Sequence, residues 1–580
     1  MRRLKLTISV LLFSIICLLS INLQAGNLSY SFDHLYDNEA AVELLHKLHK
    51  TYPNLTELRS LGESEEDRDI WLLTINNKKT GKDTDKPGIY VDGTIHGNEV
   101  QATEVCLYLA YYLLDNYGEI ESITKLVDSR AFYIIPIVNV DSRSRFFTDP
   151  GGYDIGRTAR VPYDDDRDGV ADEDGYDDLD GDGEILEMRI KDPYGNYKTS
   201  PDDPRAMVRV KPGEKGEWRR LGEEGIDNDG DGRINEDTPG YLDMNRNYGF
   251  MWQPRYVQSG AGDFPMSSMP TKAVSEFIIT KMNICFNFAF HNAGRLWVRG
   301  PGSKLAGMYA PSDVKVYDYL GEEGEKICPE YRYIIGGQDM YTTYGDFDEF
   351  MYSNLGIFGF VGELYSSRKE SFKAHDAPDD QDSKVSYWGG TKTEERLKFN
   401  DRLSQGQMFR EWKKFNHPQF GEIEIGGWRT FTSRIPQDFM LHEMVHRNAS
   451  MVIFTASQTP EVKLSLIGVT DLGNGLKQIR VRAENANALP SLSTKIMKSG
   501  IVRKDMFKIE GNGLEVVSGG TITDILYDRV AYVEYRPWLV FTNVPSFGKR
   551  EIQWIVKGTG TVTITYDAVK AANQTLKVKL

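Results

Sequence analysis

The amino-acid sequence predicts an α/β fold with a mixed, largely parallel sheet flanked by helices, followed by an all-β sandwich domain. Between residues 40 and 455, apolar strand-like runs alternate with helical segments, which is the pattern of a sheet covered by helices. From about residue 461, short segments alternate apolar and polar residues with turns between them, which is typical of a β-sandwich. The 580 residues suffice for two or three domains, and we expect them at 26–455 and 461–580.

Residues 1–25 have the features of an export signal. Three basic residues precede the apolar run 8–23, which ends near Ala25 and Gly26. This order predicts a secretory signal peptide, so we expect a secreted, periplasmic or cell-surface protein with no membrane span in the mature chain. An uncleaved membrane anchor is the alternative, although the run is short for a span. Three cysteines follow this segment: Cys106, Cys285 and Cys328. Their odd number argues against a disulfide framework.

His96 and Glu99 form the first candidate metal site. The apolar run 88–91 before them reads as a buried strand, and 103–116 after them reads as an amphipathic helix. Imidazole nitrogen and carboxylate oxygen are both good Zn²⁺ ligands, and a spacing of three residues lets both side chains reach one ion. The carboxyl end of a strand is where open α/β sheets place their sites. The motif is short, however, and by itself it often arises by chance.

The net charge of −16 is concentrated in an acidic insert at about 150–240. Residues 164–187 contain 13 acids and one arginine, and residues 227–237 contain five acids and one arginine, so these segments account for the whole imbalance. Charges elsewhere nearly cancel, and we therefore expect no nucleic-acid partner.

The acidic segments repeat one pattern three times. Aspartates stand at loop positions 1, 3 and 5, and glycine follows at position 6, which is how a short loop wraps Ca²⁺. The last ligand comes earlier than in a helix-loop-helix hand, so the loops resemble those of dockerin and thrombospondin-type repeats. A solvated acidic linker is the alternative, but it would not place glycine at the same offset three times. We expect two or three structural Ca²⁺ ions, without which the insert is not ordered, held by Asp164, Asp166, Asp168, Asp174, Asp178, Asp180, Asp182, Glu187, Asp227, Asp229, Asp231 and Asp237.

Two further apolar runs end in side chains of the kind that a metal site needs. The run 284–290 is followed by His291, and the run that begins at residue 356 closes on Glu363. Together with His96 and Glu99, these residues supply three Zn²⁺ ligands and one general base.

With these motifs in order, the chain resembles the zinc carboxypeptidase family typified by carboxypeptidases A and B. The resemblance covers residues from about 30 to 455, interrupted by the insert. It rests on the metal turn at His96 and Glu99, the segment Asn245-Arg246, the metal histidine His291, and the Phe-x-x-Glu-Leu segment around Glu363. It implies the zinc carboxypeptidase fold and an exported metallocarboxypeptidase that hydrolyses the C-terminal bond of peptides or proteins.

The resemblance also implies roles for individual residues. His96, Glu99 and His291 would hold one catalytic Zn²⁺, and Glu363 would be the general base for the zinc-activated water. Asn245 and Arg246 would bind the free C-terminal carboxylate of the substrate. The mobile tyrosine of the family matches Tyr341 best and Tyr344 second.

Two assignments depend on weaker matches to the family. The family has two arginines three residues apart, of which one stabilises the oxyanion, and here Arg157 and Arg160 have this spacing, with Arg160 preferred. The position that selects the C-terminal side chain falls on Asp348, beside Glu349, and a buried carboxylate there favours Lys or Arg. Sliding the alignment by one residue places Phe347 there instead and predicts apolar side chains.

Several other readings compete with this one. The segment from His442 to His446 fits His-Glu-x-x-His, the zinc motif of another metallopeptidase class, but its apolar neighbours favour a packing helix. A cell-wall peptide amidase of the same fold would share the zinc residues. A non-catalytic, calcium-dependent binding protein would use the insert and the β domain. That β domain shows no catalytic cluster, and we favour a folding or docking module over a carbohydrate-binding one.

Overall fold

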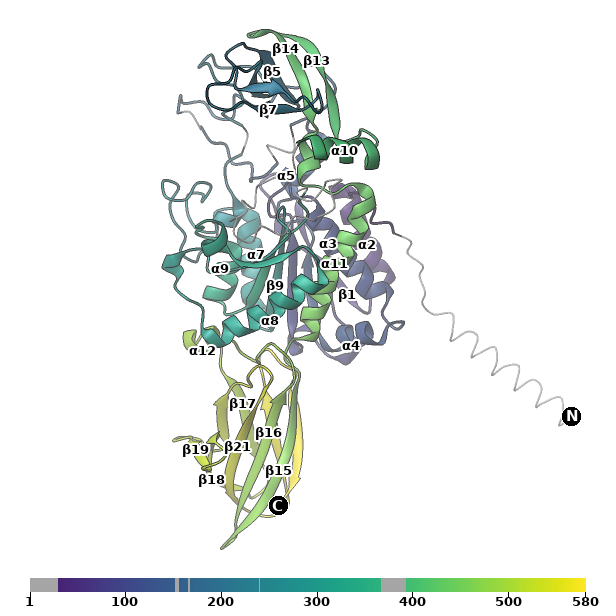
Figure 1. Cartoon of the computed structure of the whole chain (residues 1–580). Coiled ribbons are helices and arrows are strands. Elements are labelled where there is room, and N and C mark those ends of the chain that lie inside the picture. The colour runs from purple at the N-terminus through teal and green to yellow at the C-terminus, as the bar shows by residue number, and fades with distance from the viewer. Residues whose placement is uncertain (1–29, 152–155, 165–166, 239, 367–392) are drawn as a thin grey trace, which may run out of the picture.

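The computed structural model describes residues 30–151, 156–164, 167–238, 240–366 and 393–580. The predicted signal peptide lies outside these residues. Figure 1 shows three parts along one line: the insert at the top, a central α/β domain, and a β domain at the bottom. No helix in the described part of the chain is long and apolar enough to cross a membrane.

The central domain is built on an eight-stranded mixed sheet in the order β1-β2-β4-β3-β9-β12-β10-β11. Neighbours among β4, β3, β9 and β12 run parallel, whereas β2 is antiparallel to β4 and β10 is antiparallel to β12. The predicted fold class is thereby confirmed. The strands span Thr56–Glu63 (β1), Asp69–Ile75 (β2), Gly88–Gly93 (β3), Ala131–Ile135 (β4), Ile284–His291 (β9), Leu296–Arg299 (β10), Arg332–Ile335 (β11) and Phe358–Glu363 (β12).

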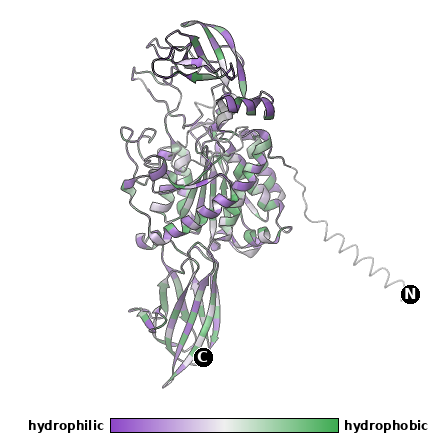
Figure 2. Ribbon diagram, viewed as in Figure 1, coloured by the Kyte–Doolittle hydropathy of each residue, from purple (hydrophilic) through white to green (hydrophobic). Residues whose placement is uncertain are grey.

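Helices cover both faces of this sheet, which explains why its inner strands are apolar on both sides. Val91 belongs to the core under α2, α3, α8 and α11, whereas its neighbour Tyr90 belongs to the core under α7. Hydrophobic residues accordingly gather in the central strands (Figure 2). The helices are Asn38–Thr51 (α2), Gln101–Asp115 (α3), Glu121–Ser129 (α4), Val140–Thr148 (α5), Met269–Thr280 (α7), Pro311–Ile327 (α8) and Asp438–Ser457 (α11), with short helical turns at Lys78–Thr80, Asp83–Asp85, Met244–Arg246, Lys304–Ala306, Gly336–Met340, Phe347–Glu349 (α9), Phe350–Asn354 and Thr430–Ser433.

The insert forms a six-stranded antiparallel sheet that also includes a hairpin from much later in the chain. Its strand order is β13-β14-β5-β8-β6-β7, and β14 pairs with β5 through Ile425 and Met188, which are both buried. The strands are Glu187–Lys191 (β5), Tyr197–Thr199 (β6), Met207–Arg209 (β7), Trp218–Glu223 (β8), Phe409–His417 (β13) and Gly421–Trp428 (β14), and helix Thr393–Leu403 (α10) precedes β13. No local pattern in the sequence predicts this shared sheet.

The C-terminal domain consists of two antiparallel sheets around a core that contains Phe507 and Trp554. It joins the central domain at the beginning of β9, where the ammonium group of Lys570 donates a hydrogen bond to the carbonyl oxygen of Ile284. Its elements are Val462–Gly473 (β15), Leu476–Asn485 (β16), Thr494–Ser499 (α12), Asp505–Glu510 (β17), Glu515–Asp524 (β18), Arg529–Tyr532 (β19), Leu539–Thr542 (β20), Gly548–Lys557 (β21), Thr561–Asp567 (β22) and Gln574–Lys579 (β23).

Candidate functional site

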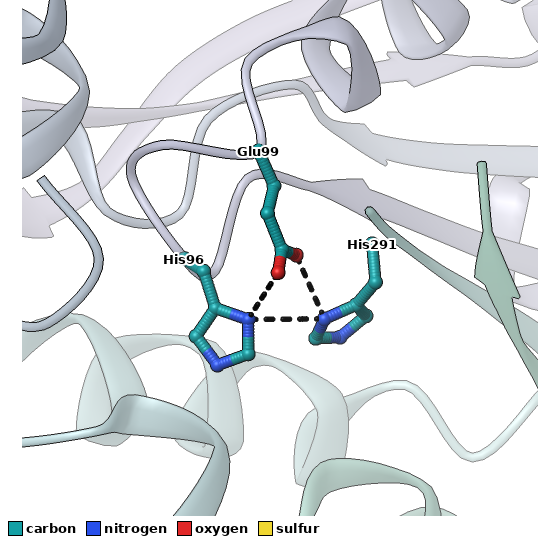
Figure 3. Close-up of side chains that lie close together, drawn as sticks. All are labelled: His96, Glu99 and His291. Carbon is teal, nitrogen blue, oxygen red and sulfur yellow. Dashed lines mark hydrogen bonds and ion pairs between the residues drawn. The ribbon is translucent and has the colours of Figure 1, made fainter. Parts of the chain in front are cut away.

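Three side chains predicted as zinc ligands converge at the carboxyl ends of β3 and β9. The turn between β3 and α3 carries His96 and Glu99, and β9 ends at His291. The Nδ1 atoms of the two histidines lie 3.2 Å apart, and each lies 3.0 Å from one carboxylate oxygen of Glu99 (Figure 3). All three residues are buried, and their ligand atoms lie within 4.8 Å of one another.

This arrangement fits a divalent metal ion. Two imidazole nitrogens and a carboxylate come together in a buried site, with ligand atoms close enough to bind one ion. Burial alone would raise the pKa of Glu99, but His96 and His291 hold it well below its usual value, so the group stays anionic. A donor set of two histidines and one glutamate, with a further position open, is typical of catalytic Zn²⁺.

Asp243 supports the metal site, a role that no sequence pattern predicted. Its Oδ1 atom lies 3.0 Å from Nε2 of His96, so the ring donates Nε2–H to this carboxylate and leaves Nδ1 free for a metal. Asp243 lies two residues before the candidate residue Asn245. It is 147 positions from His96, however, so spacing in the sequence could not connect the two residues.

Glu363 lies next to this set because of strand register. Strands β12 and β9 run parallel with Glu363 opposite His291, so both side chains emerge at the same sheet end. Burial, together with the charge of Glu99, raises the pKa of Glu363 to about 7, although His291 and Arg157 act in the opposite direction. A carboxylate with such a pKa can accept a proton near neutral pH and release it again.

One cavity joins the metal set to the other candidate residues. It is lined by His96, Glu99, Arg157, Asn245, Arg246, His291, Asn292, Val298, Gly302, Gly336, Met340, Tyr341, Thr343, Asp346, Asp348, Val361, Glu363 and Arg434. Of the catalytic and substrate-binding candidates, the structure therefore brings together Glu363, Tyr341, Asn245, Arg246 and Asp348. Arg434 follows β14 in the chain, and nothing in the sequence placed it near the site.

The segment of Asn245 and Arg246 is a short helical turn. Asp243 caps it, since its Oδ1 accepts a hydrogen bond from the backbone N–H of Asn245 at 2.8 Å. The Asn245 side-chain oxygen accepts from the N–H of Phe347 at 2.9 Å, and the Arg246 guanidinium donates to the Asn245 carbonyl at 2.7 Å. Both side chains are buried, so their orientation toward the cavity is fixed.

The two candidate arginines, Arg157 and the preferred Arg160, occupy different places. Arg157 lines the cavity, and its Nη1 atom lies 3.1 Å from Oε1 of Glu99. Arg160 does not line it, and its Nε atom lies 3.5 Å from Oε1 of Glu66. The backbone path explains this difference. The N–H of Gly97, in the turn that carries His96 and Glu99, donates to the carbonyl of Arg157. Arg160 lies three residues further along the chain, beyond this contact.

Two carboxylates, Asp346 and Asp348, line the cavity after Tyr341. Burial first, and then the charges of Asp346 and Glu349, raises the pKa of Asp348 well above its usual value. Glu349 does not line the cavity, because its oxygens accept hydrogen bonds from the hydroxyls of Tyr309 and Ser353 at 2.7 and 2.8 Å. Phe347 is fully buried in the core, and Tyr344 also lies outside the cavity lining.

The competing motif on α11 lies elsewhere. His446 shares a hydrogen bond of 2.7 Å with the hydroxyl of Tyr108, and His442 packs against the same ring. Glu443 forms an ion pair with Arg447 one turn later. Among the residues that the structure describes, these two histidines join no cluster of three potential metal ligands.

The three acidic loops repeat the same backbone contacts at their described residues. The first aspartate of each accepts hydrogen bonds from the backbone N–H groups three and five residues later, and the glycine at position 6 has positive φ. Among the described residues, four groups of acids could hold a cation: Asp168, Glu173 and Asp229; Asp174, Asp227 and Asp229; Asp178, Asp180 and Glu224; and Asp229, Asp231 and Glu236.

These groups differ from the predicted ligands in three ways. Asp174 joins aspartates of the third loop rather than its own, and Glu224, a fully buried residue outside the repeats, joins the second loop. Glu187 belongs to none of the groups and pairs with Arg220 instead. Asp164, Asp182 and Asp237 also stand outside the groups, and Asp166 lies outside the described residues.

Comparison with known proteins gives a consistent result. The family described as zinc carboxypeptidase matches residues 41–177 and 222–379, about half of the chain, and a domain of unknown function matches 461–579. Carboxypeptidase D of Anas platyrhynchos is 42% identical over 101 residues, 17% of this chain and 7% of that protein. Zinc carboxypeptidase of Saccharothrix mutabilis subsp. capreolus is 36% identical over 90 residues, 16% of this chain and 20% of that protein. The chain thus spans less than a tenth of the carboxypeptidase D sequence that it matches.

Solved structures that match this chain include carboxypeptidase A from Helicoverpa armigera, with a TM-score of 0.43 and 14% identity over 76% of this chain and 78% of that one. Bovine thrombin-activatable fibrinolysis inhibitor in complex with tick carboxypeptidase inhibitor has a TM-score of 0.42 and 15% identity over 73% of this chain and 97% of that one.

Proposed function

We propose, from the premise that this chain belongs to the zinc carboxypeptidase family, that it removes residues from the C-terminus of peptides or proteins. The observation that carries the proposal is the convergence of His96, Glu99 and His291 in one buried cluster, with Glu363 in the same cavity. A binding protein without catalytic activity would not need a general base beside a complete set of metal ligands.

His96, Glu99 and His291 would hold Zn²⁺, which, when bound, lowers the pKa of water and polarises a carbonyl group. Glu363 then has the task of a general base: it takes a proton from the attacking water and passes it to the departing amine. Burial in the cavity raises the pKa of Glu363, which helps this carboxyl group to hold the proton between the two transfers. Arg157 would face the developing negative charge on the carbonyl oxygen.

The substrate would be held by its free C-terminal carboxylate. Arg246 offers a planar guanidinium that suits a carboxylate, and buried Asn245 lies beside it in the same turn. Tyr341, which lines the cavity and is 46% exposed, would close over the bound end of the peptide. Together these groups favour a peptide end over an internal bond.

The specificity pocket would favour a basic side chain. Asp346 and Asp348 both line the cavity, and a Lys or Arg side chain would neutralise buried carboxylates that otherwise repel one another. Phe347 cannot select an apolar side chain here, since it is buried in the core against Tyr90 and Tyr248.

The test is a panel of peptides that differ only in the last residue, incubated with and without a zinc chelator. We expect release of C-terminal Arg or Lys to exceed release of Phe, and no release with the chelator or from a peptide with an amidated C-terminus. A clear preference for Phe would refute the role of Asp348, and hydrolysis of the amidated peptide would refute the carboxypeptidase assignment.

The proposal also includes export and calcium binding. The basic and apolar pattern of residues 1–25 supports export. Calcium is supported by the threefold repetition of the loop backbone and by groups of three acids whose oxygens approach one another. These ions would be structural and separate from the zinc site.

A further inference from the structure

The insert leaves and re-enters the central domain through two arms that lie side by side. The N–H of Ala159 donates to the carbonyl of Leu242 at 2.8 Å, and the rings of Tyr163 and Tyr241 stack 3.9 Å apart. Arg157 lies at the inner end of one arm, and Asn245 and Arg246 follow the inner end of the other. Both arms therefore lead to residues that line the candidate cavity.

The outer ends of the same arms are the first and third acidic loops, 164–174 and 227–237. These loops are paired: the N–H of Asp237 donates to the carbonyl of Asp174 at 3.2 Å, and the N–H of Asp172 donates to Oδ2 of Asp237 at 3.0 Å. The loops are separated by 52 residues of sequence, 175–226, yet their described residues pair in space.

Asp174 gives this unit a feature that points to a bound cation. Its side chain is 0% exposed, its Oδ1 accepts a hydrogen bond from Asn228 at 3.1 Å, and its Oδ2 has no hydrogen-bond partner among the described residues. It lies within 4.8 Å of oxygens of Asp227 and Asp229, in the other loop. A buried, unpartnered carboxylate oxygen beside two more carboxylates is costly unless a cation binds them together.

A second group has the same mixed origin, because Asp168 and Glu173 of the first loop lie with Asp229 of the third. Asp229 thus belongs to both groups. Oxygen ligands from several carboxylates are typical of Ca²⁺.

We infer that Asp168, Glu173 and Asp174 of the first loop form one shared calcium site with acids of loop 227–237, and that Asp174 is the ligand that crosses between the loops. Calcium there would keep the two arms in register, so that Arg157 and Asn245–Arg246 can bind a peptide together. Calcium would thus control peptide affinity without touching the zinc ligands. The effect on peptides rests on the proposed function, whereas the shared calcium site does not.

The test compares the full-length wild-type protein with Asp174→Asn, which keeps the side-chain shape, and with Asp202→Asn, an exposed acid of the insert outside every acidic group, as the matched control. Titration calorimetry measures how many calcium ions each protein binds, and metal analysis measures its zinc content. KM and kcat for a peptide substrate are then measured with calcium and with a calcium-selective chelator. We expect Asp174→Asn to bind less calcium and to raise KM about 10-fold or more at unchanged zinc content, since misplaced substrate-holding groups cost at least that much. Asp202→Asn should match the wild type.

Limited proteolysis of the wild type provides a readout that needs neither a variant nor an active enzyme. Calcium should protect segment 158–242 from cleavage, and Asp174→Asn should lose this protection. Full calcium stoichiometry in Asp174→Asn overturns the shared site, and reduced stoichiometry with an unchanged KM overturns the coupling to the peptide site. Absence of all peptidase activity together with calcium-dependent protection counts against the proposed function and supports the shared site.

Discussion

At the scale of single residues, Glu363 and Glu99 show how environment separates two buried glutamates. Glu99 lies between two histidines that favour its anionic form, whereas Glu363 faces Glu99 and is shifted by burial to a pKa of about 7. One carboxylate thus stays charged as a ligand, and the other can exchange a proton.

Replacing Glu363 with glutamine should separate these two roles. The amide keeps the size of the side chain but cannot accept a proton, so we expect activity to fall by about 100-fold or more while zinc content stays at one per chain. The measurement is kcat alongside zinc analysis. Near-normal turnover would remove Glu363 from the mechanism, whereas loss of zinc would show that it supports the ligand set.

The two arginines provide a second residue-scale prediction. Arg157→Ala should lower kcat/KM by roughly 100-fold, in the range found when a transition-state donor is removed. Arg160→Ala should leave kcat/KM within a few-fold of the wild type, because Arg160 contacts Glu66 and does not line the cavity. Parallel kinetic measurements on both variants decide between them, and the opposite ranking would restore Arg160.

Residues joined by local spacing could be predicted from the sequence, and residues joined only by folding could not. His96 and Glu99 share one turn, and His291 and Glu363 each end an apolar run, so pattern alone brought them together. Asp243 reaches His96 from 147 positions away. Glu224 reaches the second acidic loop from outside the repeat, and no local pattern marks it as a ligand.

At the scale of elements, backbone from other parts of the chain packs tightly against the turn between β3 and α3. A Cβ atom on Gly97 would overlap the carbonyl oxygen of Gly156 and lie 2.6 Å from the carbonyl carbon of Ser142. Both contacts are with backbone that cannot easily move, so any side chain at this position would push the turn away from its support.

Gly97→Ala should therefore displace His96 and Glu99 and weaken zinc binding by about 10-fold or more, as expected when the support of a metal ligand is disturbed. The measurement is the zinc dissociation constant by competition with a chelator. Gly468→Ala, where a Cβ meets nothing within 4 Å, serves as the control. Unchanged zinc affinity in Gly97→Ala would show that the turn is free to shift.

The alternation of elements in the central domain was predictable because each inner strand is an unbroken apolar run. The sheet of the insert was not, because β5 pairs with β14, more than 200 residues later, and short half-exposed strands carry little information about their partners.

At the scale of the whole molecule, the C-terminal domain is joined to the central domain through a buried lysine. Burial lowers the pKa of Lys570 to about 8, whereas an unfolded lysine titrates near 10.4. Between these values the unfolded chain binds a proton that the folded chain does not, so this residue makes the fold more stable as pH rises. Its neighbour Cys285, whose pKa burial raises to about 11, acts in the opposite sense.

The contribution of Lys570 is therefore measured as a difference between proteins. The unfolding free energy of the wild type, relative to Lys570→Met, should rise by roughly 1–2 kcal/mol between pH 7.5 and 9.5, because one pKa unit corresponds to 1.36 kcal/mol. Urea unfolding at both pH values provides the measurement, since Cys285 is common to both proteins. The same difference for exposed Lys577→Met should be flat. A flat difference for Lys570 as well would mean that the ammonium group is solvated in the folded protein.

Strand β9 runs from the contact with the C-terminal domain to the metal cluster. Its first residue, Ile284, accepts the hydrogen bond from Lys570, and its last residue, His291, belongs to the metal cluster. The C-terminal domain thus lies below the central domain in Figure 1, at one end of β9, and the metal cluster lies at the other end of this strand. If the C-terminal domain adheres to a surface, the end of β9 that carries the metal cluster is held away from that surface.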